Sequence, residues 1–239
     1  MKKNLYLVKK LGKEELEVFI SEYKKNKNLL TSGRFFGGYT HSESYACSLR
    51  EVVRTRDERN SEKSRSTGFG DIIQVRNSDV SELFPETLSS LKTLASLFSG
   101  HLARVVIVRT INEYRYFPHI DKGYYYIFHK RYHIVLHSTG SVMMSGEETG
   151  QFTTGDIFFL DNRSVHGGKH AREDEERVHI IFDILPNNPF VIIGRFVHWL
   201  FIERAVPEVN NMSFGKGLAG VVYLMHVIIL TLLTYRYEK

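Results

Sequence analysis

The sequence predicts a mainly β fold with flanking helices, an α+β architecture. In the first hundred residues, apolar side chains recur every three or four positions in two segments, as in amphipathic helices. From residue 102 to residue 185 the apolar period becomes that of strands, with short turns of Gly, Asn, Asp or Glu between them. Short strands that follow helices in this way indicate a β-sandwich or barrel, with the helices packed against one sheet.

The N-terminal hundred residues supply the expected helices. The predicted elements are a strand at 5–8, a helix at 13–27, strand and loop at 31–48, a strand at 71–76 and a helix that begins near Ser81. Pro85 lies near the first turn of the second helix, where proline is tolerated. The predicted apolar stripe of this helix is Leu88, Leu91, Leu94 and Leu97, and Gly100 is expected to end it.

The remaining predicted elements are strands. They cover 102–111, 115–121, 131–138, 141–145, 151–160, 164–170 and 177–185. We therefore expect one domain at 1–186, with N-terminal helices at 1–100 and a β core at 101–186, followed by a hydrophobic helical C-terminal tail at 187–239.

The tail contains an uncharged segment, 217–235, whose length is close to the roughly 20 residues that cross a bilayer. Membrane association through this segment is one interpretation. The other is that the tail packs as helices on the outer sheet or at a homodimer contact. The N-terminus has no apolar stretch long enough for a signal peptide, so export is not expected.

Composition indicates a folded, intracellular protein. Apolar residues make up 42% and charged residues 25% of the chain, which is ordinary for a globular domain. The single cysteine, Cys47, excludes an internal disulfide framework and fits the reducing cytoplasm. The net charge is +5, but the most charged stretch, 49–66, mixes acids with bases and resembles a solvated helix running into a loop. No nucleic-acid partner is expected.

Four residues point to iron chemistry. His119 and Asp121 lie two positions apart in a predicted strand, so both side chains can reach one ion. With His166 they provide two imidazoles and one carboxylate, which can occupy one face of Fe(II) and leave the opposite positions open. Arg177 can bind a carboxylate in a fixed, bidentate geometry.

A turn at 171–174 would place His166 opposite Arg177 on adjacent antiparallel strands, with Cβ atoms about 4.5–5.5 Å apart. A permanent cation beside a metal ligand makes sense if a dianion such as 2-oxoglutarate connects the two. In the predicted strand 131–138, Arg131 and His133 share one face, opposite Tyr132, Ile134 and Leu136. These two polar groups suggest an anion pocket, although Arg131 could instead be a rim residue paired with surface acids.

The ordered blocks FPHID (117–121), RYHIVL (131–136), GDIFFLDNRSVH (155–166) and ERVHIIFDI (176–184) resemble the aspartyl/asparaginyl β-hydroxylase family, which includes cis-proline hydroxylases. The resemblance covers roughly 102–185. It implies a double-stranded β-helix (jelly-roll, cupin-like) core. It also implies iron ligands at His119, Asp121 and His166, 2-oxoglutarate binding by Arg177, and cosubstrate or substrate-carboxylate contacts from Arg131 and His133.

The implied activity is that of an Fe(II)/2-oxoglutarate-dependent dioxygenase. It would use dioxygen to hydroxylate an amino acid, free or as a peptidyl Asp, Asn or Pro residue, and release succinate and CO2. The alternative is a cupin-like module that binds a metal or ligand without oxidative turnover. A halogenase is disfavoured by Asp121, because a chloride would need that coordination position.

Overall fold

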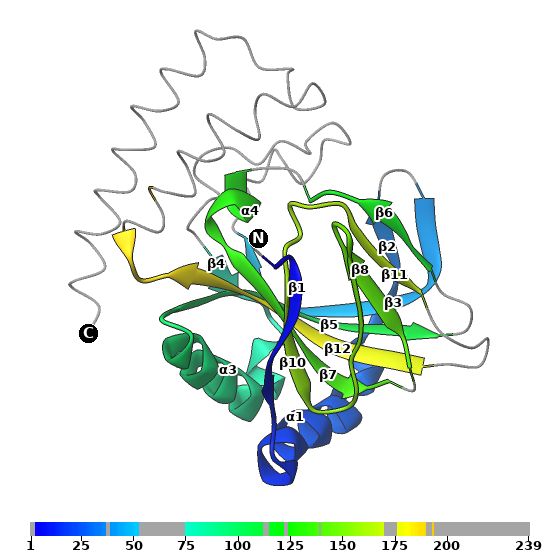
Figure 1. Cartoon of the computed structure of the whole chain (residues 1–239). Coiled ribbons are helices and arrows are strands. Elements are labelled where there is room, and N and C mark those ends of the chain that lie inside the picture. Colours follow the sequence, from blue (N-terminus) through cyan, green and yellow to red (C-terminus); the bar gives the residue numbers. More distant parts are fainter. Residues whose placement is uncertain are drawn as a thin grey trace, which may run out of the picture.

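The structure, a computed structural model, describes residues 3–36, 39–52, 75–111, 115–121, 124–138, 140–169, 176–189 and 193 (Figure 1). Its helical elements are α1 (Lys13–Asn26), η1 (Lys27–Leu29), η3 (Ser81–Leu83), α3 (Pro85–Leu97) and α4 (Tyr124–Phe128). Its strands are β1 (Leu5–Lys10), β2 (Thr31–Phe36), β3 (Tyr39–Val52), β4 (Val75–Asn77), β5 (Gly100–Ile111), β6 (Arg115–His119), β7 (Lys130–His137), β8 (Val142–Ser145), β9 (Glu148–Gln151), β10 (Asp156–Leu160), β11 (His166–Lys169) and β12 (Glu176–Pro186).

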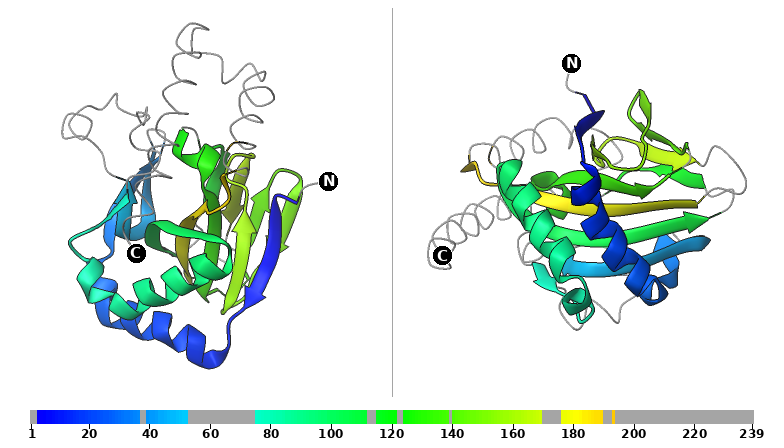
Figure 2. Two further views of the ribbon diagram at one scale, coloured as in Figure 1. Left: turned by 90° about the vertical axis from the view of Figure 1, so that its left-hand side faces the viewer. Right: turned by 90° about the horizontal axis from the view of Figure 1, so that it is seen from below.

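The described strands form two antiparallel sheets. The large sheet has the order β1-β10-β7-β12-β5-β3-β2, with β4 paired to β3, and the small sheet has the order β6-β11-β8-β9. From β5 to β8, and again from β10 to β12, consecutive strands alternate between the sheets. Helices α1 and α3 lie side by side against one face of the large sheet (Figure 2), as predicted. The expected mainly β fold with flanking helices is confirmed.

The alternation in β7 and β12 divides the molecule into a helix-facing core and a polar interior between the sheets. Tyr132, Ile134 and Leu136 pack with α1 and α3, as their predicted common face requires. In β12, Val178, Ile180 and Phe182 join the same cluster. The opposite face of each strand therefore carries the charged and imidazole side chains.

Glu22 of α1 joins the two helices. Its carboxylate accepts the backbone N–H groups of Glu86 and Thr87 in the first turn of α3, at 3.1 and 2.8 Å. These groups have no partner within their own helix, and Pro85 at the start of α3 has no N–H to satisfy. A carboxylate here also interacts favourably with the positive end of the helix dipole.

Three details of the second predicted helix are wrong. Helix α3 begins at Pro85, after a separate 3-10 turn, and Leu97 is 68% exposed instead of completing the apolar stripe. At 3.6 residues per turn, a strict three-residue spacing drifts by about 60° per step, so Leu97 lies about 180° around the helix from Leu88. Gly100 does not end the helix either. It begins β5, where an added Cβ would lie 2.3 Å from Ile184 Cγ2.

Other predicted boundaries also need correction. Strand β3 continues to Val52, so residues 49–52 are not helical, and the segment expected as one strand at 151–160 is divided between β9 and β10. The predicted strand at 71–76 overlaps β4, but 71–74 lie outside the described residues. So does the whole segment 217–235. Within the part of the chain that the structure describes, no helix has the length and apolar character to span a bilayer.

Candidate functional site

A pocket of about 550 Å³, its open mouth included, lies between the two sheets. All six residues predicted to form the site line it. The lining residues are Val108, His119, Asp121, Arg131, His133, Met143, Leu160, His166, Gly167, Arg177, His179 and Ile181.

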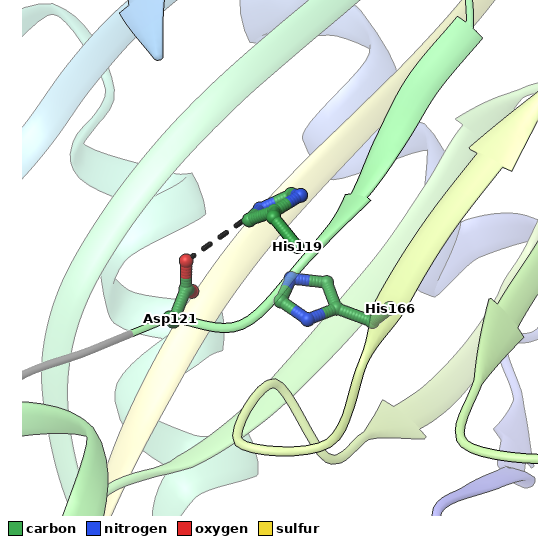
Figure 3. A group of neighbouring side chains, drawn as sticks. All are labelled: His119, Asp121 and His166. Atoms are coloured by element: carbon green, nitrogen blue, oxygen red, sulfur yellow. Dashed lines mark ion pairs between the residues drawn. The ribbon is translucent and has the colours of Figure 1, made fainter. Parts of the chain in front are cut away.

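Three of these side chains form a compact cluster at the pocket (Figure 3). His119 is the last residue of β6 and His166 the first of β11, and the two residues are paired directly across these strands. Their rings are 4.3 Å apart between centroids, and His119 Nε2 is 3.6 Å from Asp121 Oδ1. One ligand atom from each residue lies within 4.8 Å of the others, close enough to share one ion.

Asp121 reaches the cluster from outside the strand, contrary to the prediction that it shares a strand with His119. Strand β6 ends at His119, and the backbone N–H of Asp121 donates to the carbonyl of Asn162 at 2.9 Å. The side-chain amide of Asn162 also donates to Asp121 Oδ2, at 3.0 Å. Asn162 therefore fixes both the backbone and the carboxylate of Asp121.

His166 presents one imidazole nitrogen to the cluster. Its Nδ1–H donates to the carbonyl of Ser164 at 3.0 Å, which leaves Nε2 as the atom with an unprotonated lone pair. Burial lowers the pKa of His166 to about 4, although the neighbouring Asp121 opposes the shift. At neutral pH the ring is uncharged and able to coordinate a metal.

Asp121 is ionised under the same conditions. Burial alone would raise the pKa of its carboxyl group, but Arg131, His166 and the hydrogen bond from Asn162 outweigh burial and lower this pKa to about 2. A carboxylate and neutral imidazoles are the forms of these groups that bind metals. The donor set therefore fits a divalent transition metal such as Fe(II), which accepts imidazole and carboxylate ligands.

Arg131 has two carboxylate partners. Its Nη1 donates to Asp121 Oδ2, while Nε and Nη2 form a bidentate pair with Asp183 at 2.8 and 3.1 Å. Asp183 lies directly opposite Arg131 on β12, and the guanidinium lies 5.2 Å from the ring centroid of Tyr126. These contacts differ from the exposed rim position considered above, because Arg131 is only 8% exposed.

Arg177 lines the pocket, but it is not where the sequence predicted. The predicted hairpin between His166 and Arg177 is wrong: β11 belongs to the small sheet, where His166 pairs with His119 and Ser145, and Arg177 pairs with Thr110 in the large sheet. The two side chains instead enter one pocket from facing sheets. Arg177 is 3% exposed, and its Nη1 lies 2.9 Å from Met143 Sδ on the opposite sheet.

His133 and His179 form a pair beside this arginine. Their Nδ1 atoms are 3.3 Å apart, and the ring of His133 stacks on Phe158 at 4.7 Å between centroids. His133 shares the pocket-facing side of β7 with Arg131, as predicted, and His179 shares the pocket-facing side of β12 with Arg177. The pocket thus has a cluster that could bind a metal ion at one place and cationic or hydrogen-bonding groups at another.

Two residues that surround the cluster were not predicted from the sequence: Asn162, which binds Asp121, and Asp183, which binds Arg131. Asp183 shares the alternating face of Arg177 and His179, and that period was the available signal. Its pairing with Arg131 depends on the register between β7 and β12, which the sequence does not reveal. Asn162 lies in the loop between β10 and β11, where no regular alternation of side chains indicates which way its side chain points.

The sequence matches no protein-family profile and no curated protein. Solved structures do match. An oxidoreductase of the 2OG-Fe(II) oxygenase family from Burkholderia pseudomallei is 11% identical with a TM-score of 0.52, over 76% of this chain and 85% of that chain. The epimerase SnoN from nogalamycin biosynthesis, in complex with Fe3+, α-ketoglutarate and nogalamycin RO, is 13% identical with a TM-score of 0.47, over 79% and 84% of the two chains. The Burkholderia structure shows the fold that the two facing sheets share with it: the predicted double-stranded β-helix core is confirmed.

Proposed function

We propose that this protein is an Fe(II)/2-oxoglutarate-dependent dioxygenase that hydroxylates an amino acid, free or as a peptidyl Asp, Asn or Pro residue. The observation that carries the proposal is the convergence of His119, Asp121 and His166 in one pocket with the buried Arg177. Two histidines and one carboxylate hold one face of an iron ion and leave the opposite positions for other ligands. The likeness to a structure of the 2OG-Fe(II) oxygenase family agrees with this proposal.

His119, Asp121 and His166 would hold the metal, through the histidine nitrogens and one carboxylate oxygen. His166 is already oriented for this by its Nδ1–H bond to Ser164. When bound together, iron, 2-oxoglutarate and dioxygen supply the oxidising chemistry, with succinate and CO2 as co-products.

Arg177 would bind the far carboxylate of 2-oxoglutarate. It lies in the wall opposite the cluster and is buried, so a charge-assisted, bidentate hydrogen bond there would be shielded from water. His133 would add a hydrogen bond to the same cosubstrate from the neighbouring strand, with its ring held against Phe158. Arg131 was predicted to share this role, but its nitrogens are directed to Asp121 and Asp183.

The test is turnover. The protein, reconstituted anaerobically with Fe(II) and 2-oxoglutarate, is exposed to dioxygen with a panel of amino acids and peptides. Mass spectrometry then follows succinate and any product that has gained one oxygen atom. We expect succinate only when iron is present, its loss in His166→Ala, and its loss in Arg177→Leu at 2-oxoglutarate concentrations that suffice for wild type.

The alternative is a metal- or ligand-binding module without oxidative turnover, since cupin-like folds also serve that purpose. It predicts stoichiometric metal binding but no consumption of 2-oxoglutarate with any candidate substrate. Succinate formation that depends on Arg177 would exclude it.

A further inference from the structure

We infer that Arg131 and Asp183 are positioning residues that hold Asp121 as a metal ligand through one oxygen only. The guanidinium of Arg131 joins the carboxylates of Asp183 and Asp121. The inference rests on the proposed function, because it assigns these residues a role toward the metal.

The two oxygens of Asp121 have different partners. Oδ2 accepts hydrogen bonds from Arg131 Nη1 and from Asn162 Nδ2, which fills the positions around it. Oδ1 faces the Nε2 atom of His119 at 3.6 Å. Oδ1 is therefore the oxygen left for the cluster, and the carboxylate would bind the metal through that atom.

Arg131 itself is also fixed. Its other two nitrogens are held by Asp183, which is the residue directly opposite on β12, in a regular part of the β7–β12 ladder. The planar guanidinium offers three nitrogens in a rigid fork, so holding Asp183 determines where Nη1 points. A lysine ammonium has no such fork and could satisfy one carboxylate without orienting the other.

A cation next to a ligand carboxylate repels a divalent metal, and Asp183 is placed to neutralise that cation. If Arg131 were only a neighbouring charge, its removal would strengthen metal binding. If it orients Asp121, its removal weakens metal binding. The two roles predict opposite signs, and this makes the inference testable without catalytic turnover.

The experiment titrates metal-free protein with Co(II) anaerobically, using calorimetry for affinity and the visible absorption of Co(II) for coordination geometry. We expect Arg131→Gln and Asp183→Asn each to bind Co(II) about 10- to 100-fold more weakly than wild type, with an altered spectrum. Arg131→Lys keeps the charge but should not restore affinity. The control is Glu176→Gln, which breaks the bidentate pair with Arg109 at the other end of β12 and should bind as wild type does.

The double variant Arg131→Gln/Asp183→Asn deals with folding, because it leaves neither Arg131 nor Asp183 buried without the other, and Asp121 keeps its hydrogen bond from Asn162. Its far-ultraviolet circular dichroism should match wild type, while its Co(II) affinity should stay low. Wild-type affinity in the double variant, or unchanged or tighter binding in Arg131→Gln, overturns the positioning role. If the variants lose affinity as expected but wild type never consumes 2-oxoglutarate, only the oxygenase proposal fails. If wild type binds no Co(II), both fail.

Discussion

If His119, Asp121 and His166 bind a metal, as proposed, that metal stabilises the folded state, and the stabilisation depends on His166. A ligand present at 100 times its Kd stabilises the folded state by about 2.7 kcal/mol. For a domain of this size, about 2–4 °C of melting temperature corresponds to each kcal/mol, so Co(II) at that concentration should raise the Tm of wild type by about 5–11 °C. The metal needs all three ligands, whose donor atoms lie within 4.8 Å of one another.

His166→Ala removes one of the three and should weaken Co(II) binding by at least about 100-fold. At the same metal concentration the stabilisation then falls to about 0.4 kcal/mol, a shift of about 1–2 °C. The assay is thermal unfolding of each variant with and without Co(II), so that any change in metal-free stability cancels. His137→Ala, at an exposed position of β7, is the matched control and should keep the full shift. A full shift in His166→Ala would refute the assignment of this cluster as the metal site.

Three further predictions test the pocket and the core. Arg177→Leu should raise the 2-oxoglutarate concentration for half-maximal succinate formation by about 10- to 150-fold, since a hydrogen bond to a charged group contributes about 1.5–3 kcal/mol; unchanged dependence would remove Arg177 from the cosubstrate site. Gly168→Ala would place a Cβ 2.9 Å from Met143 Sδ and 3.4 Å from Arg177 Nη1. The free energy of unfolding in urea should therefore fall by about 1–3 kcal/mol. Unchanged stability would contradict the close packing around Gly168. Leu91→Ala opens a cavity between α3 and the large sheet, because Leu91 is fully buried, and should cost about 2–5 kcal/mol in the same assay; a loss below about 1 kcal/mol would contradict the packing.

The sequence was most informative where a two-residue period crosses a buried sheet. In β7 it correctly separated Arg131 and His133 from Tyr132 and Ile134, because a strand buried on both faces still places successive side chains on opposite sides. The same period holds in β12, where Arg177 and His179 share the face that lines the pocket. The fold class followed from the order of helices and strands.

The period does not say which sheet a strand joins. The spacing between His166 and Arg177 is compatible with a tight hairpin, yet β11 pairs with β6 and β8 in the small sheet. The hairpin was predicted to bring an arginine near the cluster. An arginine does line the same pocket as the cluster, because the facing sheets bring the side chains of His166 and Arg177 into it. What changed is the direction of approach: Arg177 faces the cluster across the pocket and is not adjacent to it on the same sheet.

Contacts made by residues outside regular strands could not be predicted from the sequence. Asp121 lies past the end of β6, and its orientation comes from Asn162 and Arg131, which are far from it along the chain. Asp183 could be assigned a face but not a partner, because the β7–β12 register is set by the packing of whole strands. The residues that orient a candidate metal-binding side chain are therefore harder to predict than that side chain itself.

The most direct test of the oxygenase proposal needs no substrate. Protein reconstituted with Fe(II) under anaerobic conditions is titrated with 2-oxoglutarate, and the visible charge-transfer absorption of an iron(II)–keto acid chelate is recorded. We predict that this absorption appears at one 2-oxoglutarate per protein, is absent in His166→Ala, and needs a higher 2-oxoglutarate concentration in Arg177→Leu. Iron binding in wild type without this absorption at any 2-oxoglutarate concentration would contradict the proposal and favour the binding module.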